Sequence, residues 1–235
     1  MSEEKVNLEK IKSAHFIGIG GIGISAIARM LLLRGVKVSG SDQSDGEVIE
    51  ELRKAGAVIS IGHSSSNIPL DSEMVIYTIA IPESNPELVE AKKLGIPLMT
   101  YPETLTAISL SHKTIAVAGT HGKTTTTGMM AHVLVELDKD PTVVIGSFLK
   151  TTDGGRSNFI AGKGEYFVVE ACEYKKSFLN ITPTIAIITN IEEDHLDFYK
   201  DIENIKNAFF EFASRIKEGG VLVLNLTEKN SKEIK

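Results

Sequence analysis

The chain has 235 residues, of which 42% are hydrophobic and 24% are charged, and its formal net charge is −6. This length suits one large or two small domains with a buried core, and the acidic balance argues against a nucleic-acid or anionic-membrane binder. No apolar run is long enough to span a membrane, the first residues lack the apolar core typical of a signal peptide, and the single cysteine excludes an internal disulfide framework. We therefore expect a cytoplasmic α/β protein with no nucleic-acid and no membrane partner.

The first half of the chain alternates short apolar runs with helical segments. In chain order, the expected elements are a strand at 14–19, a helix at 24–33, a strand at 36–40, a helix at 47–55, strands at 57–61 and 74–78, a helix at 85–94 and a strand at 96–100. Asn85 and Pro86 favour the start of the third helix, as N-cap and first helical residue. Such alternation predicts right-handed βαβ units and a mainly parallel sheet.

The pattern restarts near residue 111, where we place a domain boundary. The expected elements of the second part are strands at 114–118, 142–145, 166–170, 184–190 and 221–225, with a helix at 126–137. A further helix is marked by an apolar stripe, formed by Ile205, Ala208, Phe209, Phe212 and Ile216. We expect this stripe to lack a cover and the unfinished sheet to expose an edge.

A glycine-rich turn follows the first strand. Gly18 to Gly23 satisfy the G-x-G-x-x-G pattern, and Asp42 follows at the end of the second strand. Glycines allow close approach of a diphosphate, and the acid suits a ribose hydroxyl. The same donors fit a nicotinamide dinucleotide or another nucleotide such as a UDP-sugar, and a purely structural glycine turn also remains open.

A second glycine-containing turn lies between the strand at 114–118 and the following helix. Gly119 to Thr125 read Gly-Thr-His-Gly-Lys-Thr-Thr, which departs from G-x-x-x-x-G-K-[ST] in the position of its first glycine. Backbone amides and the helix dipole favour an anion there. Lys123 can reach terminal phosphates and the Thr124 hydroxyl can bind Mg²⁺. This context favours nucleotide binding over a plain helix-capping loop.

Polar side chains follow the next strands of this part. Glu170 ends the strand at 166–170, and Asn190 and His195 follow the strand at 184–190. The carboxyl ends of parallel strands share one sheet edge, where ligands bind. A carboxylate and phosphates suit a first Mg²⁺, and a His–carboxylate pair suits a second ion. The acids around His195 could instead be a solvated helix start.

These segments together resemble the Mur ligase family of bacterial cell-wall synthesis. The matching segments are 15–25, 40–42, 85–87, 119–125, 170–174 and 189–195. The resemblance covers essentially the whole chain and favours a UDP-sugar over a nicotinamide dinucleotide in the first domain. Sibling ligases carry a carbamoylated lysine where this chain has Phe210, so the resemblance is to the alanine-adding members.

The resemblance implies a Rossmann-like UDP-sugar-binding domain at 1–111 and an incomplete P-loop-type ATP-binding central domain at 112–235. It also implies ATP-dependent ligation of L-alanine to UDP-N-acetylmuramate through an acyl phosphate, with Mg²⁺. The resemblance also implies a third domain that binds the amino acid; we expect this chain to lack it and therefore to show little activity alone. Rival hypotheses are a murein-peptide recycling ligase, a non-catalytic nucleotide-binding fragment and a nicotinamide-dependent oxidoreductase.

The resemblance also assigns roles to individual residues. The implied UDP-sugar contacts are Gly18, Ile19, Gly20, Gly21, Ile22, Gly23, Ser41 and Asp42. The implied ATP contacts are Gly119, Thr120, His121, Gly122, Lys123, Thr124, Thr125 and Asn190. Lys123, Glu170 and His195 are the implied catalytic residues, and Thr124, Glu170 and His195 are the implied metal ligands.

Overall fold

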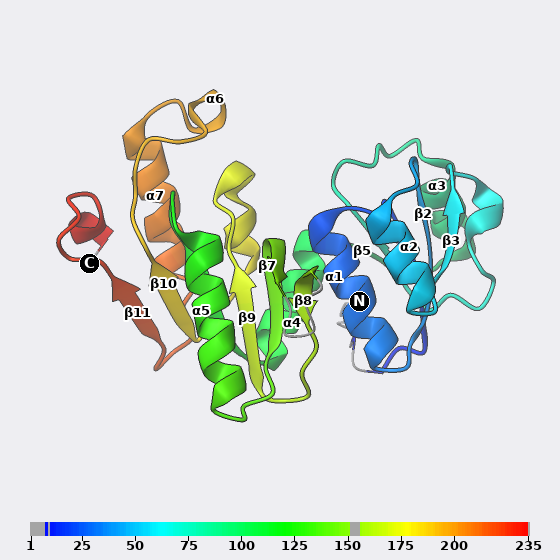
Figure 1. Ribbon diagram of the computed structural model, residues 1–235. Helices are drawn as coiled ribbons and strands as arrows, with labels where there is room; N and C mark the ends of the chain where they lie inside the picture. The colour runs from blue at the N-terminus through cyan, green and yellow to red at the C-terminus, as the bar shows by residue number, and fades with distance from the viewer. Residues whose placement is uncertain (1–7, 9, 151–155, 235) are drawn as a thin grey trace. The chain divides into compact units, whose positions relative to one another are not determined.

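The computed structural model describes residues 8, 10–150 and 156–234, and the chain divides into two compact units, Met1–Ala107 and Ile108–Lys235. Both units are α/β, with helices packed on a central sheet (Figure 1). The expected fold class is therefore confirmed. The division lies inside one helix, α4, which spans Tyr101–Ser111.

The first unit contains one parallel sheet with the strand order β3-β2-β1-β4-β5. Its elements are β1 (Ser13–Ile17), α1 (Ile22–Leu33), β2 (Lys37–Asp42), α2 (Glu47–Lys54), β3 (Val58–Ile61), β4 (Val75–Tyr77), α3 (Pro86–Leu94), β5 (Leu98–Thr100) and α4. This is the Rossmann-like order, in which strands are added first on one side of β1 and then, from β4 on, on the other. Ligands of such sheets bind at the carboxyl ends of the strands beside this point.

Local capping sets the ends of the helices in this unit. The Asn85 side chain accepts hydrogen bonds from two backbone amides at the start of α3, as its sequence predicts, and Gly95 ends the helix in the left-handed conformation. The sequence analysis did not predict α4. Its start is a capping box, because the Glu103 carboxylate accepts from the Thr100 amide at 2.7 Å and the Thr100 hydroxyl accepts from the Glu103 amide at 3.3 Å.

The second unit contains a mixed sheet with the strand order β11-β10-β6-β9-β7-β8, in which only β7 and β8 pair antiparallel. Its helices and strands are β6 (Lys113–Ala118), α5 (Lys123–Glu136), β7 (Thr142–Lys150), β8 (Arg156–Ile160), β9 (Tyr166–Glu170), β10 (Ile185–Ile188), α6 (Leu196–Tyr199), α7 (Ile202–Ala213) and β11 (Val221–Leu224). The sequence analysis missed β8, which forms a hairpin with a β7 longer than expected. The helix α5 begins at Lys123, three residues before its expected start.

The apolar stripe of α7 is covered, contrary to the sequence-based expectation. A short 3₁₀ helix, Tyr174–Asn180, brings Phe178 onto the helix. The Phe178 ring stacks on Phe212 with centroids 4.8 Å apart and meets Phe209 edge-on at 5.2 Å. All three rings are fully buried. The turn after β9 therefore supplies the cover that the sequence periodicity does not reveal.

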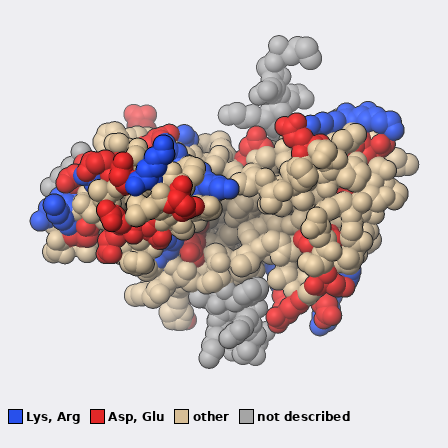
Figure 2. Space-filling model, turned by 90° about the horizontal axis from the view of Figure 1, so that it is seen from above, with Lys and Arg blue, Asp and Glu red and all other residues tan. Residues whose placement is uncertain are grey.

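The visible surface carries acidic and basic side chains that are intermixed, without a broad area of one sign (Figure 2). Among the residues that the structure describes, no helix has both the length and the apolar character needed to cross a bilayer. On the face shown in Figure 2, charge does not mark a binding site.

Candidate nucleotide and cation sites

The glycine-rich turn of the first unit packs against the end of β2. The Gly18 and Ile19 amides donate to the Ser41 carbonyl at 2.8 and 3.0 Å, and the Gly20 amide donates to Asp42 Oδ2 at 2.8 Å. A Cβ on Gly20 would lie 2.9 Å from that same carboxylate oxygen, so a larger residue there would displace the Asp42 side chain. The glycine-rich turn is thus hydrogen-bonded to Asp42, as the predicted site requires. Two other predicted UDP-sugar contacts, Ile19 and Ser41, have side chains that are fully buried.

Beside this turn lies a buried carboxylate to which the sequence patterns assigned no role. Glu87 is fully buried at the start of α3. Its carboxylate is contacted by His15 Nε2 at 3.0 Å, the Ser41 hydroxyl at 2.7 Å, the Ser64 amide at 3.1 Å and the Asn67 side-chain amide at 2.8 Å. Burial alone would raise the pKa of Glu87, but the hydrogen bonds from His15, Ser41 and Asn67 outweigh it and lower the pKa to about 2.

The turn of the second unit has the geometry of a phosphate cradle. Gly119 follows β6 with φ +135°, and a Cβ there would lie 2.0 Å from Thr189 Oγ1, so no other residue fits. Gly122 precedes α5, and no side chain caps this helix. The amides of its first turn have no intrahelical partner, which makes the start of a 14-residue helix available to an anion.

The segment after β10 holds this turn in place. The Asn190 side chain accepts from the His121 amide at 2.9 Å and donates to the His121 carbonyl at 3.1 Å. The Asn190 carbonyl accepts from the Thr120 amide at 3.0 Å, and the Thr120 hydroxyl accepts from the Glu192 amide at 2.9 Å. Asn190 is therefore brought to the turn as expected, and the contacts of its side chain are with the turn's backbone.

Two predicted metal ligands lie together at the start of α5. The Thr124 hydroxyl donates to both oxygens of Glu170, at 3.0 and 3.1 Å. The same carboxylate accepts from the Gly146 amide at 2.9 Å. A hydroxyl and a carboxylate at the mouth of a phosphate cradle are oxygen ligands of the type that Mg²⁺ prefers.

Lys123 is turned back towards its own loop. Its ammonium donates to the Gly119 carbonyl at 2.6 Å, the Thr120 carbonyl at 3.1 Å and Glu173 Oε1 at 2.9 Å. The Lys123 and Glu173 side chains are 15% and 3% exposed, so this ion pair is largely shielded from water. Glu173 lies within the segment 170–174 that resembles the Mur ligase family, and the resemblance assigned it no role.

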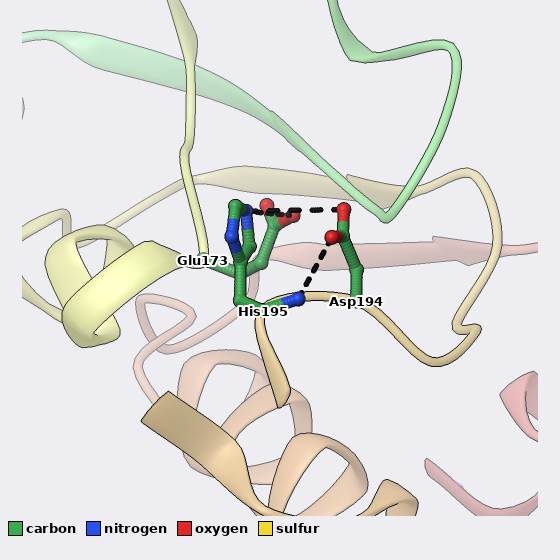
Figure 3. A group of neighbouring side chains, drawn as sticks. All are labelled: Glu173, Asp194 and His195. Carbon is green, nitrogen blue, oxygen red and sulfur yellow. Dashed lines mark hydrogen bonds and ion pairs between the residues drawn. The ribbon is translucent and has the colours of Figure 1, made fainter. Parts of the chain in front are cut away.

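His195 lies with Glu173 and Asp194, which the sequence analysis did not identify as a set (Figure 3). His195 Nε2 is 3.8 Å from Glu173 Oε1 and 3.8 Å from Asp194 Oδ2. One ligand atom from each residue lies within 4.8 Å of the others, which makes them a candidate cation group. The predicted metal ligands thus fall into two groups, with Thr124 and Glu170 in one and His195 in the other.

Comparison with protein families accounts for both units. The model of the Mur ligase family catalytic domain matches residues 13–113, and that of the Mur ligase middle domain matches residues 117–235. The chain belongs to the Mur ligase family. The two matched regions meet close to the division between the compact units.

Curated relatives in this family are UDP-N-acetylmuramate–L-alanine ligases. The Clostridium acetobutylicum protein is 48% identical over 93% of this chain and 47% of its own length. The Clostridium tetani protein is 48% identical over 97% of this chain and 49% of its own length. The chain therefore spans about half the length of the curated relatives it matches.

Solved structures of the family have the same fold. The UDP-N-acetylmuramate–alanine ligase of Thermotoga maritima matches with a TM-score of 0.78 and 34% identity, over 94% of this chain and 51% of that one. The UDP-N-acetylmuramate:L-alanyl-γ-D-glutamyl-meso-diaminopimelate ligase of Neisseria meningitides matches with a TM-score of 0.80 and 26% identity, over 95% and 74%. Fold similarity alone thus does not separate these two kinds of Mur ligase.

Proposed function

We propose that this chain carries the UDP-sugar-binding and ATP-binding parts of a ligase that joins L-alanine to UDP-N-acetylmuramate in the cytoplasm, a step of peptidoglycan synthesis. The 48% identity to curated alanine-adding ligases supports the choice of substrates. The observation that carries the ATP-binding part is the arrangement at the start of α5, where an uncapped helix, the Lys123 ammonium and the Thr124–Glu170 pair converge.

The proposed reaction forms an amide from a carboxylate, which is a poor electrophile. A carboxylate oxygen of UDP-N-acetylmuramate attacks the γ-phosphorus of ATP and ADP leaves. The alanine nitrogen then attacks the resulting acyl phosphate, phosphate leaves and the nitrogen loses a proton. The first-turn amides of α5 orient the phosphates, and Lys123 neutralises charge that develops on the transferring phosphoryl group.

The residues present fit Mg²⁺. Thr124 and Glu170 would hold one ion, and His195 with its neighbouring carboxylates would hold another. One observation that supports this fit is that Glu173 Oε2 is buried without a hydrogen-bond partner among the described residues. Mg²⁺ supplies charge neutralisation on the phosphate oxygens when it is bound.

The first unit is proposed to bind the UDP part of the sugar nucleotide. The glycine turn and Asp42 lie at the carboxyl ends of β1 and β2, next to the point where the strand order reverses. This geometry by itself suits any ribose diphosphate, including a nicotinamide dinucleotide. The family membership favours the UDP-sugar.

Calorimetric titration of the chain with UDP-N-acetylmuramate, NADH and a non-hydrolysable ATP analogue with Mg²⁺ tests this proposal. We expect binding of the UDP-sugar and the ATP analogue but not of NADH. Lys123→Ala should abolish binding of the ATP analogue and leave UDP-sugar binding nearly unchanged, because Lys123 lies in the second unit. Binding of NADH alone, or loss of both ligands in this variant, would overturn the two-site assignment.

A second candidate is a ligase that adds a tripeptide, as in murein recycling, and the TM-score of 0.80 to the Neisseria enzyme favours keeping it. Both reactions use the same sugar nucleotide, so the amine substrate distinguishes them. Phosphate release by the whole protein, measured with L-alanine and with L-alanyl-γ-D-glutamyl-meso-diaminopimelate, decides between them. The higher identity to the alanine-adding enzymes leads us to expect release with L-alanine.

A further inference from the structure

A ring nitrogen without a partner lies at the carboxyl edge of the first sheet. His63 follows the end of β3 by two residues, its side chain is 11% exposed, and its Nε2 is buried with no hydrogen-bond partner among the described residues. The large majority of buried side-chain polar atoms in folded proteins have a partner. The bare nitrogen of His63 therefore points to a ligand that this position takes up.

The other ring nitrogen of His63 is held by the carboxylate of Glu87. His63 Nδ1 lies 3.0 Å from the Ser41 hydroxyl oxygen and 3.4 Å from Glu87 Oε1. The Ser41 hydroxyl lies 2.7 Å from Glu87 Oε2, and an ionised carboxylate only accepts, so Ser41 donates its single hydroxyl proton to Glu87. The Ser41 oxygen is left to accept, and His63 Nδ1 carries the proton that it accepts. In the neutral ring, Nε2 is consequently a hydrogen-bond acceptor.

The second imidazole on this carboxylate has the opposite tautomer. His15 Nε2 lies 3.0 Å from Glu87 Oε2 and donates to it, whereas His15 Nδ1 accepts from the Ser39 hydroxyl at 2.8 Å. Both ring nitrogens of the fully buried His15 thus have partners. Of the two imidazoles, His63 is the one with a nitrogen left for a ligand.

The position of His63 along the sheet edge indicates which part of a nucleotide it meets. The strand order β3-β2-β1 places the glycine-rich turn after β1, Asp42 at the end of β2 and His63 after β3. The Gly62 amide donates to the Asp42 carbonyl at 2.7 Å, which ties the last two of these positions together. In sheets of this type the turn takes the diphosphate and the acid takes a ribose hydroxyl. The next position outward is that of the nucleobase.

Uracil offers a hydrogen that suits an acceptor at this position. N3 of uracil carries a proton between two carbonyl groups, whereas N3 of cytosine has a lone pair and no proton. An acceptor that faces N3 therefore favours uracil, because cytosine would bring two lone pairs together. Sites built on such a hydrogen bond discriminate strongly, since the wrong ligand leaves buried polar groups unpaired.

We propose that His63 determines specificity for uracil by accepting the N3 proton at Nε2, and that Glu87 is the positioning residue that fixes the required tautomer through Ser41. The inference rests on the proposed function in one respect, namely that the nucleotide of the first unit is a uridine nucleotide. The tautomer is a property of the ligand-free chain and can be measured without any nucleotide.

The first measurement is the ¹⁵N spectrum of the histidine rings in the ligand-free chain at about pH 8.5, where a free imidazole is neutral. Protonated and bare ring nitrogens differ widely in chemical shift, and His63→Gln and His132→Gln identify the signals of these residues. We expect Nδ1–H for His63, against the Nε2–H form that free histidine prefers and that the exposed His132 should show. Glu87→Gln should shift His63 towards that ordinary form. Ser41→Ala, which removes the nearer partner of Nδ1, replaces Glu87→Gln if circular dichroism shows that protein to be misfolded.

The second measurement is calorimetric titration with UDP and with CDP. The unmodified chain should bind UDP about tenfold or more tighter than CDP. His63→Gln should lower this preference to about threefold or less, because a glutamine amide presents either a donor or an acceptor. His132→Gln, the matched control in the second unit, should keep the full preference. Titration with 2′-deoxy-UDP distinguishes the base from the ribose as the partner of His63, and its loss of affinity relative to UDP should be the same with and without His63.

The outcomes separate this inference from the proposed function. A His63 ring with Nε2–H in the ligand-free chain, or a preference for UDP that survives His63→Gln, would overturn the inference and leave the UDP-sugar site standing. A loss of affinity for 2′-deoxy-UDP that disappears in His63→Gln would make the ribose the partner and would also overturn it. Binding of neither UDP nor CDP by a chain with the expected tautomer would overturn the proposed function of the first unit, and the base recognition with it.

Discussion

Replacing the buried carboxylate of the first unit, Glu87→Gln, should destabilise that unit strongly. Three neutral donors and the imidazoles of His15 and His63 converge on this carboxylate, which is fully buried. A pKa that falls from 4.5 to about 2 corresponds to about 3 kcal/mol of stabilisation of the charged form in the folded state. Removing one partner of a buried charged network costs a similar amount, about 3–5 kcal/mol.

Acid provides an independent check on this figure. Because folding lowers the pKa of Glu87, its contribution is present above pH 4.5 and is lost as the pH falls towards about 2. The glutamine variant has no such group to protonate. The stability difference between the two proteins should therefore be largest near neutral pH, shrink below pH 4.5 and be nearly gone near pH 2.

Differential scanning calorimetry suits the measurement, since the two units can unfold in separate transitions. Glu90→Gln is the matched control, because Glu90 lies on the same helix and its ion-pair partner among the described residues is the exposed Lys93; surface ion pairs contribute about 0–1 kcal/mol. A Glu87→Gln protein as stable as this control, or a difference that does not diminish in acid, would refute the reasoning.

Three further changes test other parts of the structure. Gly119→Ala should weaken binding of the ATP analogue by about tenfold or more, because the added Cβ would lie 2.0 Å from Thr189 Oγ1 and would distort the turn. A distortion that costs about 1.4 kcal/mol lowers the affinity tenfold. An unchanged affinity in calorimetric titration would contradict this prediction. Phe178→Ala should cost about 3–5 kcal/mol in urea unfolding, against about 1 kcal/mol or less for the 54%-exposed Phe210→Ala, and equal losses would show that the aromatic cover is unimportant. Tyr199→Phe should lower stability by about 1 kcal/mol below pH 10. Burial, then the charge of a nearby glutamate, raises the pKa of Tyr199 from 10 to about 12, so the folded state keeps a proton that the unfolded state loses, and the deficit should shrink above pH 10; a deficit independent of pH would count against this assignment.

Local patterns were sufficient for most of the fold. Apolar runs and glycine stops located the parallel strands, and Asn85 with Pro86 located the start of α3. The sequence also indicated that Thr124 and Glu170 would meet, since both follow adjacent parallel strands at one sheet edge. Apolar periodicity did not predict α4. The start of this helix depends on the reciprocal capping of Thr100 and Glu103, and this pair of residues is visible in the sequence as a capping-box pattern.

The pairing of Glu173 with Lys123 and the cover of α7 were decided only by the tertiary structure. Both depend on the turn after β9, where Lys175 and Lys176 adopt the left-handed conformation and direct the chain back over the sheet edge and α7. No composition or spacing rule predicts such a conformation for two lysines. The sequence by itself determined which segments form strands, helices and phosphate-binding turns, because those depend on neighbouring residues. Lys123 lies 50 residues from Glu173 in the sequence and His15 lies 72 residues from Glu87, and only the folded chain brings these pairs together.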